Sequence, residues 1–142
     1  MDIRPFRESD TYEVVELWKA CGLTVPWNDP HKDIARKVAT DPEKFLVGEL
    51  AGEIVGCCMV GYDGHRGWIN YLAVHPGSQR KGYASEIMAE AERVLREAGC
   101  PKINLQIRAS NKVVIAFYES IGFKVDEVLS MGKRLEVDGP GG

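Results

Sequence analysis

Residues 71–98 read YLAVHPGSQRKGYASEIMAEAERVLREA, and this stretch decides how the rest of the chain is interpreted. Its first four residues, Tyr71 to Val74, form an apolar run that predicts a buried strand. A His-Pro-Gly turn and a polar, basic loop follow, and from Gly82 to Ala98 apolar residues recur at helical spacing. Unpaired amides and the helix dipole favour anions at a helix N-terminus, so this loop is expected to cradle the phosphates of a cofactor.

Before this stretch, the pattern predicts a short edge strand at residues 2–6, two helices, and three strands. The helices follow Asp10 (or Ser9) and Asp29, whose side chains can cap them, and Pro30 suits the first position of the second helix. The three strands are expected at residues 45–50, 54–62 and 68–74. Tight glycine-containing turns join them, which favours an antiparallel meander.

After this stretch, a strand is expected at residues 103–107, a helix from Asn111 to about Gly122, and two last strands at 123–125 and 128–135. The fold class is therefore α/β (α+β mixed), with a mostly antiparallel central sheet of six to seven strands, a βαβ crossover and helices on both faces. Residues 1–137 are expected to form a single domain, and 138–142 a flexible Pro/Gly-rich tail.

Composition narrows the class of protein. With 44% hydrophobic and 27% charged residues, the chain is typical of a soluble globular protein. The net charge of -3 argues against nucleic acid as a partner. No signal peptide or membrane-length apolar run is visible, so the cytoplasm is the expected location. Four cysteines and three scattered histidines match no metal-ligand spacing, which favours small buried thiols in a reducing compartment and no metal.

Two motifs resemble the GNAT superfamily of N-acetyltransferases. VHPGSQRKGYA, residues 74–84, is similar to that family's acetyl-coenzyme A signature, and ASNKVVIAFYESIGF, residues 109–123, is similar to its second block. The order of the expected elements agrees with the family from end to end. The strings PWNDP, GYDGHRG and GCPKI further resemble an uncharacterised subgroup of bacterial acetyltransferases within it.

The resemblance implies a site for acetyl-coenzyme A as acetyl donor. In the family, the strand matching residues 71–74 splays from the strand matching 103–107, and the pantetheine arm bonds amides near Leu72 and Val74. Tyr118 matches the tyrosine taken as general acid for the departing thiolate. The cofactor-binding residues expected in this way are Leu72, Ala73, Val74, Gln79, Arg80, Lys81, Gly82, Tyr83, Ala84, Ser85, Asn111 and Tyr118.

The positions at which family members carry the general base differ in this chain. Family members often carry a Glu on the strand matching residues 68–74, which this chain lacks, and Gln106 stands where the ribosomal-protein N-terminal acetyltransferases have a Glu. The candidates are Asp63 and His65, with Glu49 or a water chain at Asn70 as alternatives. An acceptor pocket is expected between the connector after the first helix and the turn after the third strand. Its residues are Trp27, Asn28, Asp29, Asp63, His65 and Arg66.

The expected function is direct transfer of an acetyl group from acetyl-coenzyme A to a primary amine of a small molecule or peptide. Two alternatives remain open: a non-catalytic acyl-coenzyme A sensor that kept the cradle, and an enzyme that uses a longer acyl donor. Exposed edge strands also favour a homodimer.

Overall fold

A five-stranded sheet forms the centre of the computed structural model, which describes residues 1–139. The strands are β1 (Asp2–Pro5), β2 (Phe45–Leu50), β3 (Glu53–Tyr62), β4 (Gly67–Val74) and β5 (Ile103–Leu105). The helices are α1 (Thr11–Ala20), α2 (Pro30–Thr40), α3 (Tyr83–Glu97) and α4 (Lys112–Ser120). Short 3-10 turns lie at Glu8–Asp10, Pro42–Lys44 and Pro76–Ser78.

The sheet is mixed. Its strands lie in the order β1-β2-β3-β4-β5, and the first four are antiparallel to their neighbours. β5 is parallel to β4, and α3 connects the two, which confirms the predicted βαβ crossover. The prediction of six to seven strands is wrong, because five are present in residues 1–139.

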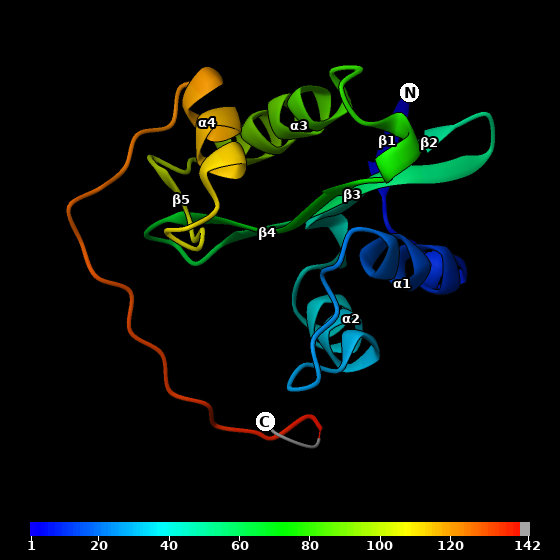
Figure 1. Cartoon of the computed structure of the whole chain (residues 1–142), viewed down its shortest axis with the longest axis horizontal. Coiled ribbons are helices and arrows are strands. Elements are labelled where there is room, and N and C mark those ends of the chain that lie inside the picture. Colours follow the sequence, from blue (N-terminus) through cyan, green and yellow to red (C-terminus); the bar gives the residue numbers. More distant parts are fainter. Residues whose placement is uncertain (140–142) are drawn as a thin grey trace.

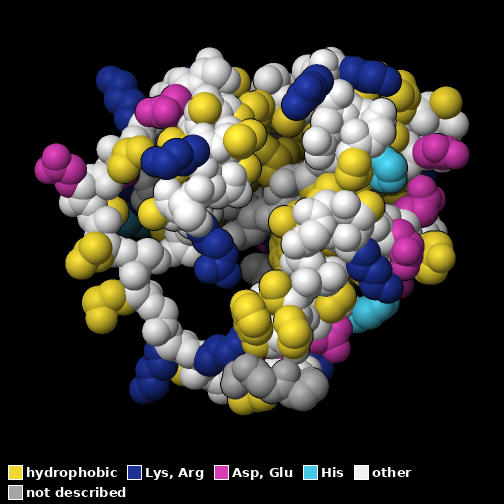
Figure 2. Space-filling view, viewed as in Figure 1, with side chains coloured by type: hydrophobic (Ala, Val, Ile, Leu, Met, Phe, Trp, Pro, Cys, Tyr) yellow, Lys and Arg dark blue, Asp and Glu magenta, His cyan; other side chains and the backbone are white. Residues whose placement is uncertain are grey.

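The two missing strands were expected at residues 123–125 and 128–135, where the chain is instead irregular. A strand needs a backbone ladder, whereas this segment is held by side chains: Lys102 Nζ lies 2.8 Å from Asp126 Oδ2, and Gln106 donates to Ser130. Its apolar residues are therefore left exposed, and Figure 2 shows them on the arm that arches away from the body. They are Val125, Val128, Leu129, Met131, Leu135 and Val137.

Two apolar cores cover the two faces of the sheet (Figure 1). On one face α1 and α2 pack around the fully buried Trp18 and Phe45. On the other, α3 and α4 pack around Ile87, Leu95 and Tyr118. Helices therefore cover both faces of the sheet, as predicted. β4 and β5 meet at one end of the sheet's strand order, between these two helical layers.

Local signals account for most helix ends. Asp29 caps α2 as predicted, since its carboxylate accepts from the amide of His31 at 2.9 Å, and Pro30 takes the first position. Gly82 begins α3 with φ of +82°, and Gly99 follows its end with φ of +83°. Asp10 precedes α1 but makes no side-chain cap there; its carboxylate instead accepts from the Arg4 guanidinium at 2.8 and 2.9 Å.

The predicted flexible tail, 138–142, lies partly outside the described residues. Within them, Asp138 accepts from Arg36 Nη2 at 2.6 Å and from the amide of Asp29 at 3.2 Å. The single-domain prediction for residues 1–137 stays a prediction.

Candidate active site

β4 and β5 separate partway along their length. Gly67 pairs with Ile103, Trp68 with Asn104 and Ile69 with Leu105; within residues 1–139 the pairing of these strands goes no further. The remainder of β4, from Asn70 to Val74, therefore pairs with β3 along one edge. Its other edge, on the side of β5, is open. This is the splay expected from the resemblance.

The open edge carries free backbone groups. The amide of His75 donates to Val55 O at 2.8 Å and so points toward β3. Successive amides of a strand point in opposite directions, so Ala73 also faces β3, where it pairs with Cys57. The amides of Leu72 and Val74 accordingly face the open edge and that of Ala73 does not; contacts of these three residues with pantetheine stay predictions. Gln79 closes this edge at one end, since its Nε2 donates to Val74 O at 3.0 Å.

The loop after β4 leads to the N-terminus of α3. Gly82 adopts a left-handed backbone, and a Cβ built on it would meet no protein atom within 4 Å. The glycine is thus required by its φ, and the space before it is open. The first intrahelical bond runs from Glu86 N to Gly82 O, which leaves the amides of the first turn, Tyr83, Ala84 and Ser85, to other partners. Arg80 and Lys81 are exposed beside them.

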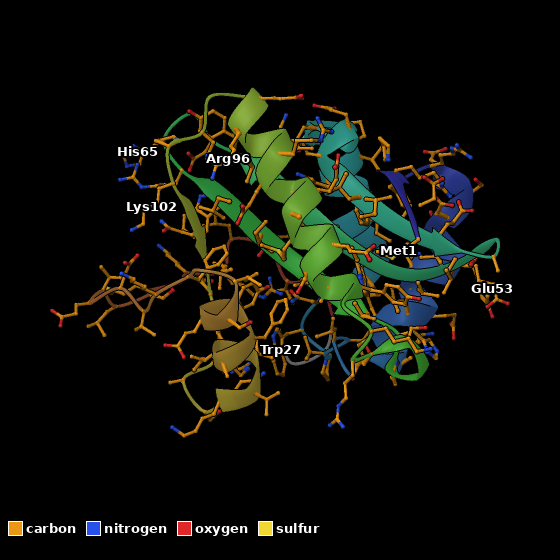
Figure 3. All side chains as sticks on the ribbon, turned by 90° about the horizontal axis from the view of Figure 1, so that it is seen from above. Met1, Trp27, Glu53, His65, Arg96 and Lys102 are labelled. Carbon is orange, nitrogen blue, oxygen red and sulfur yellow. The ribbon has the colours of Figure 1, made fainter. Side chains whose placement is uncertain are left out.

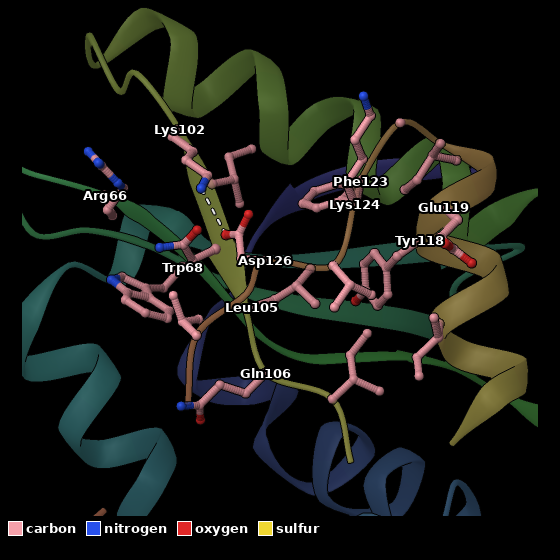
Figure 4. A pocket seen from close by; sticks show the side chains of 18 of the residues that line it. Arg66, Trp68, Lys102, Leu105, Gln106, Tyr118, Glu119, Phe123, Lys124 and Asp126 are labelled. Atoms are coloured by element: carbon pink, nitrogen blue, oxygen red, sulfur yellow. Dashed lines mark hydrogen bonds and ion pairs between the residues drawn. The ribbon is translucent and has the colours of Figure 1, made fainter. Parts of the chain in front are cut away.

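Tyr118 lies in a cavity of about 1240 Å³ between α4, β5 and the segment after α4 (Figure 4). Leu105, Gln106 and Ile107 line the same cavity. Tyr118 is 7% exposed, its ring meets Phe117 and Phe123 edge-on, and among residues 1–139 its hydroxyl has no hydrogen-bond partner. Burial raises the pKa of Tyr118 above its usual value, so the phenol is protonated at neutral pH.

Asn111 precedes α4 and caps it. Its Oδ1 accepts from the amide of Val114 at 3.3 Å, so the helix-capping role expected for this residue is present. A contact from Asn111 to pantetheine stays a prediction.

Asp63 organises the turn between β3 and β4. Its Oδ1 accepts from the amides of His65 at 2.8 Å and Arg66 at 2.7 Å, and its Oδ2 accepts from Trp68 Nε1 at 3.1 Å. These bonds, led by that from Arg66, lower the pKa of Asp63 to about 2. A carboxylate with so low a pKa is a weak proton acceptor at neutral pH, and its bonds account for a structural role.

The predicted acceptor residues fall into two separate groups. Arg66 lines the cavity that holds Tyr118, and Asp63 and His65 occupy the turn beside it. Trp27 and Asn28 instead meet the segment after α4, where Arg134 donates to Trp27 O and Asn28 Oδ1. Figure 3 shows His65 and Trp27 well apart. The structure thus does not bring the connector and the β3–β4 turn together into one pocket.

Sequence reasoning missed Asp33 and Tyr71. The Tyr71 hydroxyl donates to Asp33 Oδ2 at 2.5 Å, and its ring stacks on Trp18 at a centroid distance of 3.9 Å. Tyr71 also has a φ of +53°, which is rare for a residue with a side chain. Within the apolar run 71–74 nothing separates this tyrosine from an ordinary strand residue, so no local pattern predicts its contacts.

Two further features bear on cofactors and location. Among residues 1–139, no three His, Cys, Asp or Glu side chains gather as a metal site would require, and the absence of a metal stays an expectation. None of the helices in the described part of the chain combines the length and apolar character needed to cross a membrane. All four cysteines are free thiols, but two rather than four are buried, namely Cys57 and Cys58.

Known proteins resemble this chain in sequence and in fold. Residues 11–123 match the family described as "Acetyltransferase (GNAT) family". An acetyltransferase of Yersinia enterocolitica is 48% identical over 138 residues, which cover 97% of this chain and 98% of the relative. A putative acetyltransferase of Agrobacterium tumefaciens has a similar fold, with a TM-score of 0.79, 18% identity, and coverage of 94% of this chain and 100% of the other. The PaiA N-acetyltransferase of Thermoplasma acidophilum, solved in complex with coenzyme A, has a TM-score of 0.75 at 17% identity, with coverage of 89% and 91%.

Proposed function

Because this chain belongs to the GNAT family of acetyltransferases, and is therefore an acyltransferase, we propose that it transfers an acetyl group from acetyl-coenzyme A to a primary amine. The acceptor is a small molecule or a peptide N-terminus or side chain, and the transfer is direct, within a ternary complex.

The observation that carries this proposal is the open edge of β4. Two amides, at Leu72 and Val74, face an edge that no strand of the described chain pairs with, and the edge leads into the N-terminus of α3. An extended pantetheine arm can add to such an edge as an extra strand, while the phosphates meet the helix amides. The Thermoplasma relative of this fold, solved with coenzyme A, supports the same donor.

The residues present fit this donor. The open space at Gly82 suits a pyrophosphate, because the unpaired amides of the first turn of α3 follow it and the exposed cations Arg80 and Lys81 precede it in the same loop. When bound, acetyl-coenzyme A supplies the thioester carbonyl that the amine attacks. An amide on the open edge of β4 can donate to the carbonyl oxygen as negative charge develops there.

Tyr118 is the proposed general acid. Its phenol is protonated at neutral pH and lines a cavity next to β5, which supports donation of its O–H proton to the departing sulfur. The amine loses a proton when the new C–N bond forms, and of the two candidate bases we assign this proton to His65, acting through a chain of waters because its turn precedes β4 and lies well away from the amides of Leu72 and Val74. Asp63 is less suited to act as the base, because its three hydrogen bonds lower its pKa and keep it ionised as a structural carboxylate of the turn.

Thiol release tests the proposal. Wild-type protein is mixed with acetyl-coenzyme A and a panel of amines, and free coenzyme A is followed with a thiol reagent. We expect turnover with at least one amine, and Tyr118→Phe should lower kcat by about 100-fold. Tyr12→Phe is the matched control, because Tyr12 is 75% exposed on α1. Binding without turnover across the whole panel would instead identify a non-catalytic acyl-coenzyme A sensor.

A longer acyl donor is the second candidate, and the cavity at Tyr118 favours it. Leu105, Ile107 and Phe123 give the cavity apolar walls that a longer acyl chain can contact. Comparing kcat/KM for acetyl-, propionyl- and hexanoyl-coenzyme A separates the two: a higher value for the longest donor would overturn the acetyl assignment.

Two further expectations complete the proposal. The exposed apolar residues after α4 support a homodimer, which sedimentation of the full chain would detect. Free thiols at all four cysteines support a location in the reducing cytoplasm.

A further inference from the structure

β4 contains a bulge at the point where it parts from β5. Cys57 pairs with Ala73 and Met59 with Asn70, so Tyr71 and Leu72 on β4 face the single residue Cys58 on β3. Tyr71 has a φ of +53°, a conformation that glycine adopts far more readily than a residue with a side chain. A residue with a Cβ is strained there, so other contacts must hold it.

The bulge decides which groups reach each side of the strand. Ile69, Leu72 and Val74 all pack against the α3 core, although Ile69 and Leu72 are three residues apart. In an unbroken strand, residues an odd number apart point to opposite faces. The extra residue therefore restores this register, and it also turns the amides of Leu72 and Val74 toward the open edge. Without the bulge, Ala73 would face that edge in their place.

Tyr71 is held from three elements. Its ring stacks on the indole of Trp18 in α1 with an interplanar angle of 13°, and its hydroxyl donates to Asp33 in α2 at 2.5 Å. Its carbonyl oxygen accepts from Cys57 Sγ at 3.4 Å, and that sulfur accepts from Trp18 Nε1 at 3.1 Å. Side chain and main chain of Tyr71 are thus both fixed.

We propose that Tyr71 is a positioning residue, which through Trp18 and Asp33 holds the bulge that presents the Leu72 and Val74 amides to the acyl donor. This inference rests on the proposed donor site. It goes beyond that site because residues of α1 and α2, on the opposite face of the sheet from α3, would maintain its geometry. Tyr71 itself donates no proton in the reaction. Burial, followed by the bond to Asp33, raises the pKa of its phenol, so the bond is present throughout the neutral range.

Three variants separate the bond from the packing. Tyr71→Phe keeps the stack on Trp18 and removes the hydroxyl; Asp33→Ala removes the acceptor; Asp33→Asn keeps an oxygen that can accept. Tyr71→Phe and Asp33→Ala each remove the hydrogen bond to a charged group that helps to hold the strained bulge. We expect kcat/KM for acetyl-coenzyme A to fall about tenfold in Tyr71→Phe and Asp33→Ala, and to stay within about threefold of wild type in Asp33→Asn.

A second readout distinguishes positioning from general loss of structure. Adenosine 3′,5′-bisphosphate carries phosphates but no pantetheine, so its dissociation constant should be unchanged in all three variants. Amide exchange at Leu72 and Val74 should change in Tyr71→Phe, and not in Tyr62→Phe, whose hydroxyl bonds to Gly64 O and Gly99 O at 3.4 Å.

The outcomes are distinct. Wild-type kcat/KM in Tyr71→Phe and Asp33→Ala would overturn the inference and leave the proposed function intact. Equal loss in Asp33→Asn and Asp33→Ala would also overturn it, because the retained acceptor would then have no effect. If wild-type protein neither binds nor uses acetyl-coenzyme A, the proposed function fails first.

Discussion

Replacing Gly82 with alanine should weaken the binding of acetyl-coenzyme A about tenfold. Gly82 has a φ of +82°, and an added Cβ would meet no protein atom within 4 Å. The substitution therefore creates no clash within the protein, and only two effects remain. The first is the strain of a left-handed L-residue, about 1–2 kcal/mol. The second is a methyl group in the space where the pyrophosphate should approach the α3 amides.

Gly99→Ala provides a matched control at the other end of the same helix. Its φ is +83°, and its Cβ would likewise meet nothing within 4 Å. Both variants should lose about 1–2 kcal/mol of unfolding free energy, which lowers Tm by roughly 3–8 °C. Only Gly82→Ala should also lose affinity for the donor, because a charge-assisted bond from an amide to phosphate contributes about 1.5–3 kcal/mol and the methyl group displaces it in part.

Calorimetric titration with acetyl-coenzyme A, and separately with adenosine 3′,5′-bisphosphate, measures the affinity, and thermal unfolding measures the strain. The tenfold loss should appear with both ligands, since both carry phosphates. Equal affinities for Gly82→Ala and Gly99→Ala, together with equal losses of stability, would refute the placement of the phosphates at this helix end.

Three further predictions concern titratable groups. Asp10→Asn should lower the unfolding free energy by about 3 kcal/mol at pH 7. Because the bond to its arginine partner lowers the pKa of Asp10, this contribution is complete above pH ~4 and is lost as pH falls further. Urea titrations should therefore show a smaller difference in unfolding free energy between wild type and variant at pH 3 than at pH 7. Asp63→Asn should keep kcat within about threefold from pH 6 to 9, whereas His65→Gln should lower it about 100-fold at pH 7; the reverse pattern would make Asp63 the base. Burial raises the pKa of Cys57 to about 12 and also raises that of Cys58, so mass spectrometry should find both unalkylated by iodoacetamide at pH 8 until the protein is denatured.

The helices and the meander could be predicted because their signals are local. Asp29 and Pro30 give the start of α2, and Gly82 and Gly99 bound α3, because capping and left-handed turns each restrict the residue at one position. The crossover followed from a strand, a long helix and another strand in sequence. The family followed from two motifs, and the comparisons confirm it.

The bulge at Tyr71 and the fate of the last segment could not be predicted in this way. Tyrosine favours strands and disfavours a positive φ, so only the contacts with Trp18 and Asp33, far away in sequence, explain its conformation. The apolar residues at 128–135 predicted a strand, but a strand also needs an edge to pair with, and a pattern in one segment does not supply that edge.

The open edge of β4 has a consequence for how this protein can change under mutation. The proposed donor contacts at Leu72 and Val74 are main-chain groups, which no single substitution removes unless it introduces proline. The side chains of the β3–β4 turn, by contrast, are replaced one codon at a time. Acceptor choice is thus the property most open to selection or engineering, while recognition of the donor is tied to the fold itself.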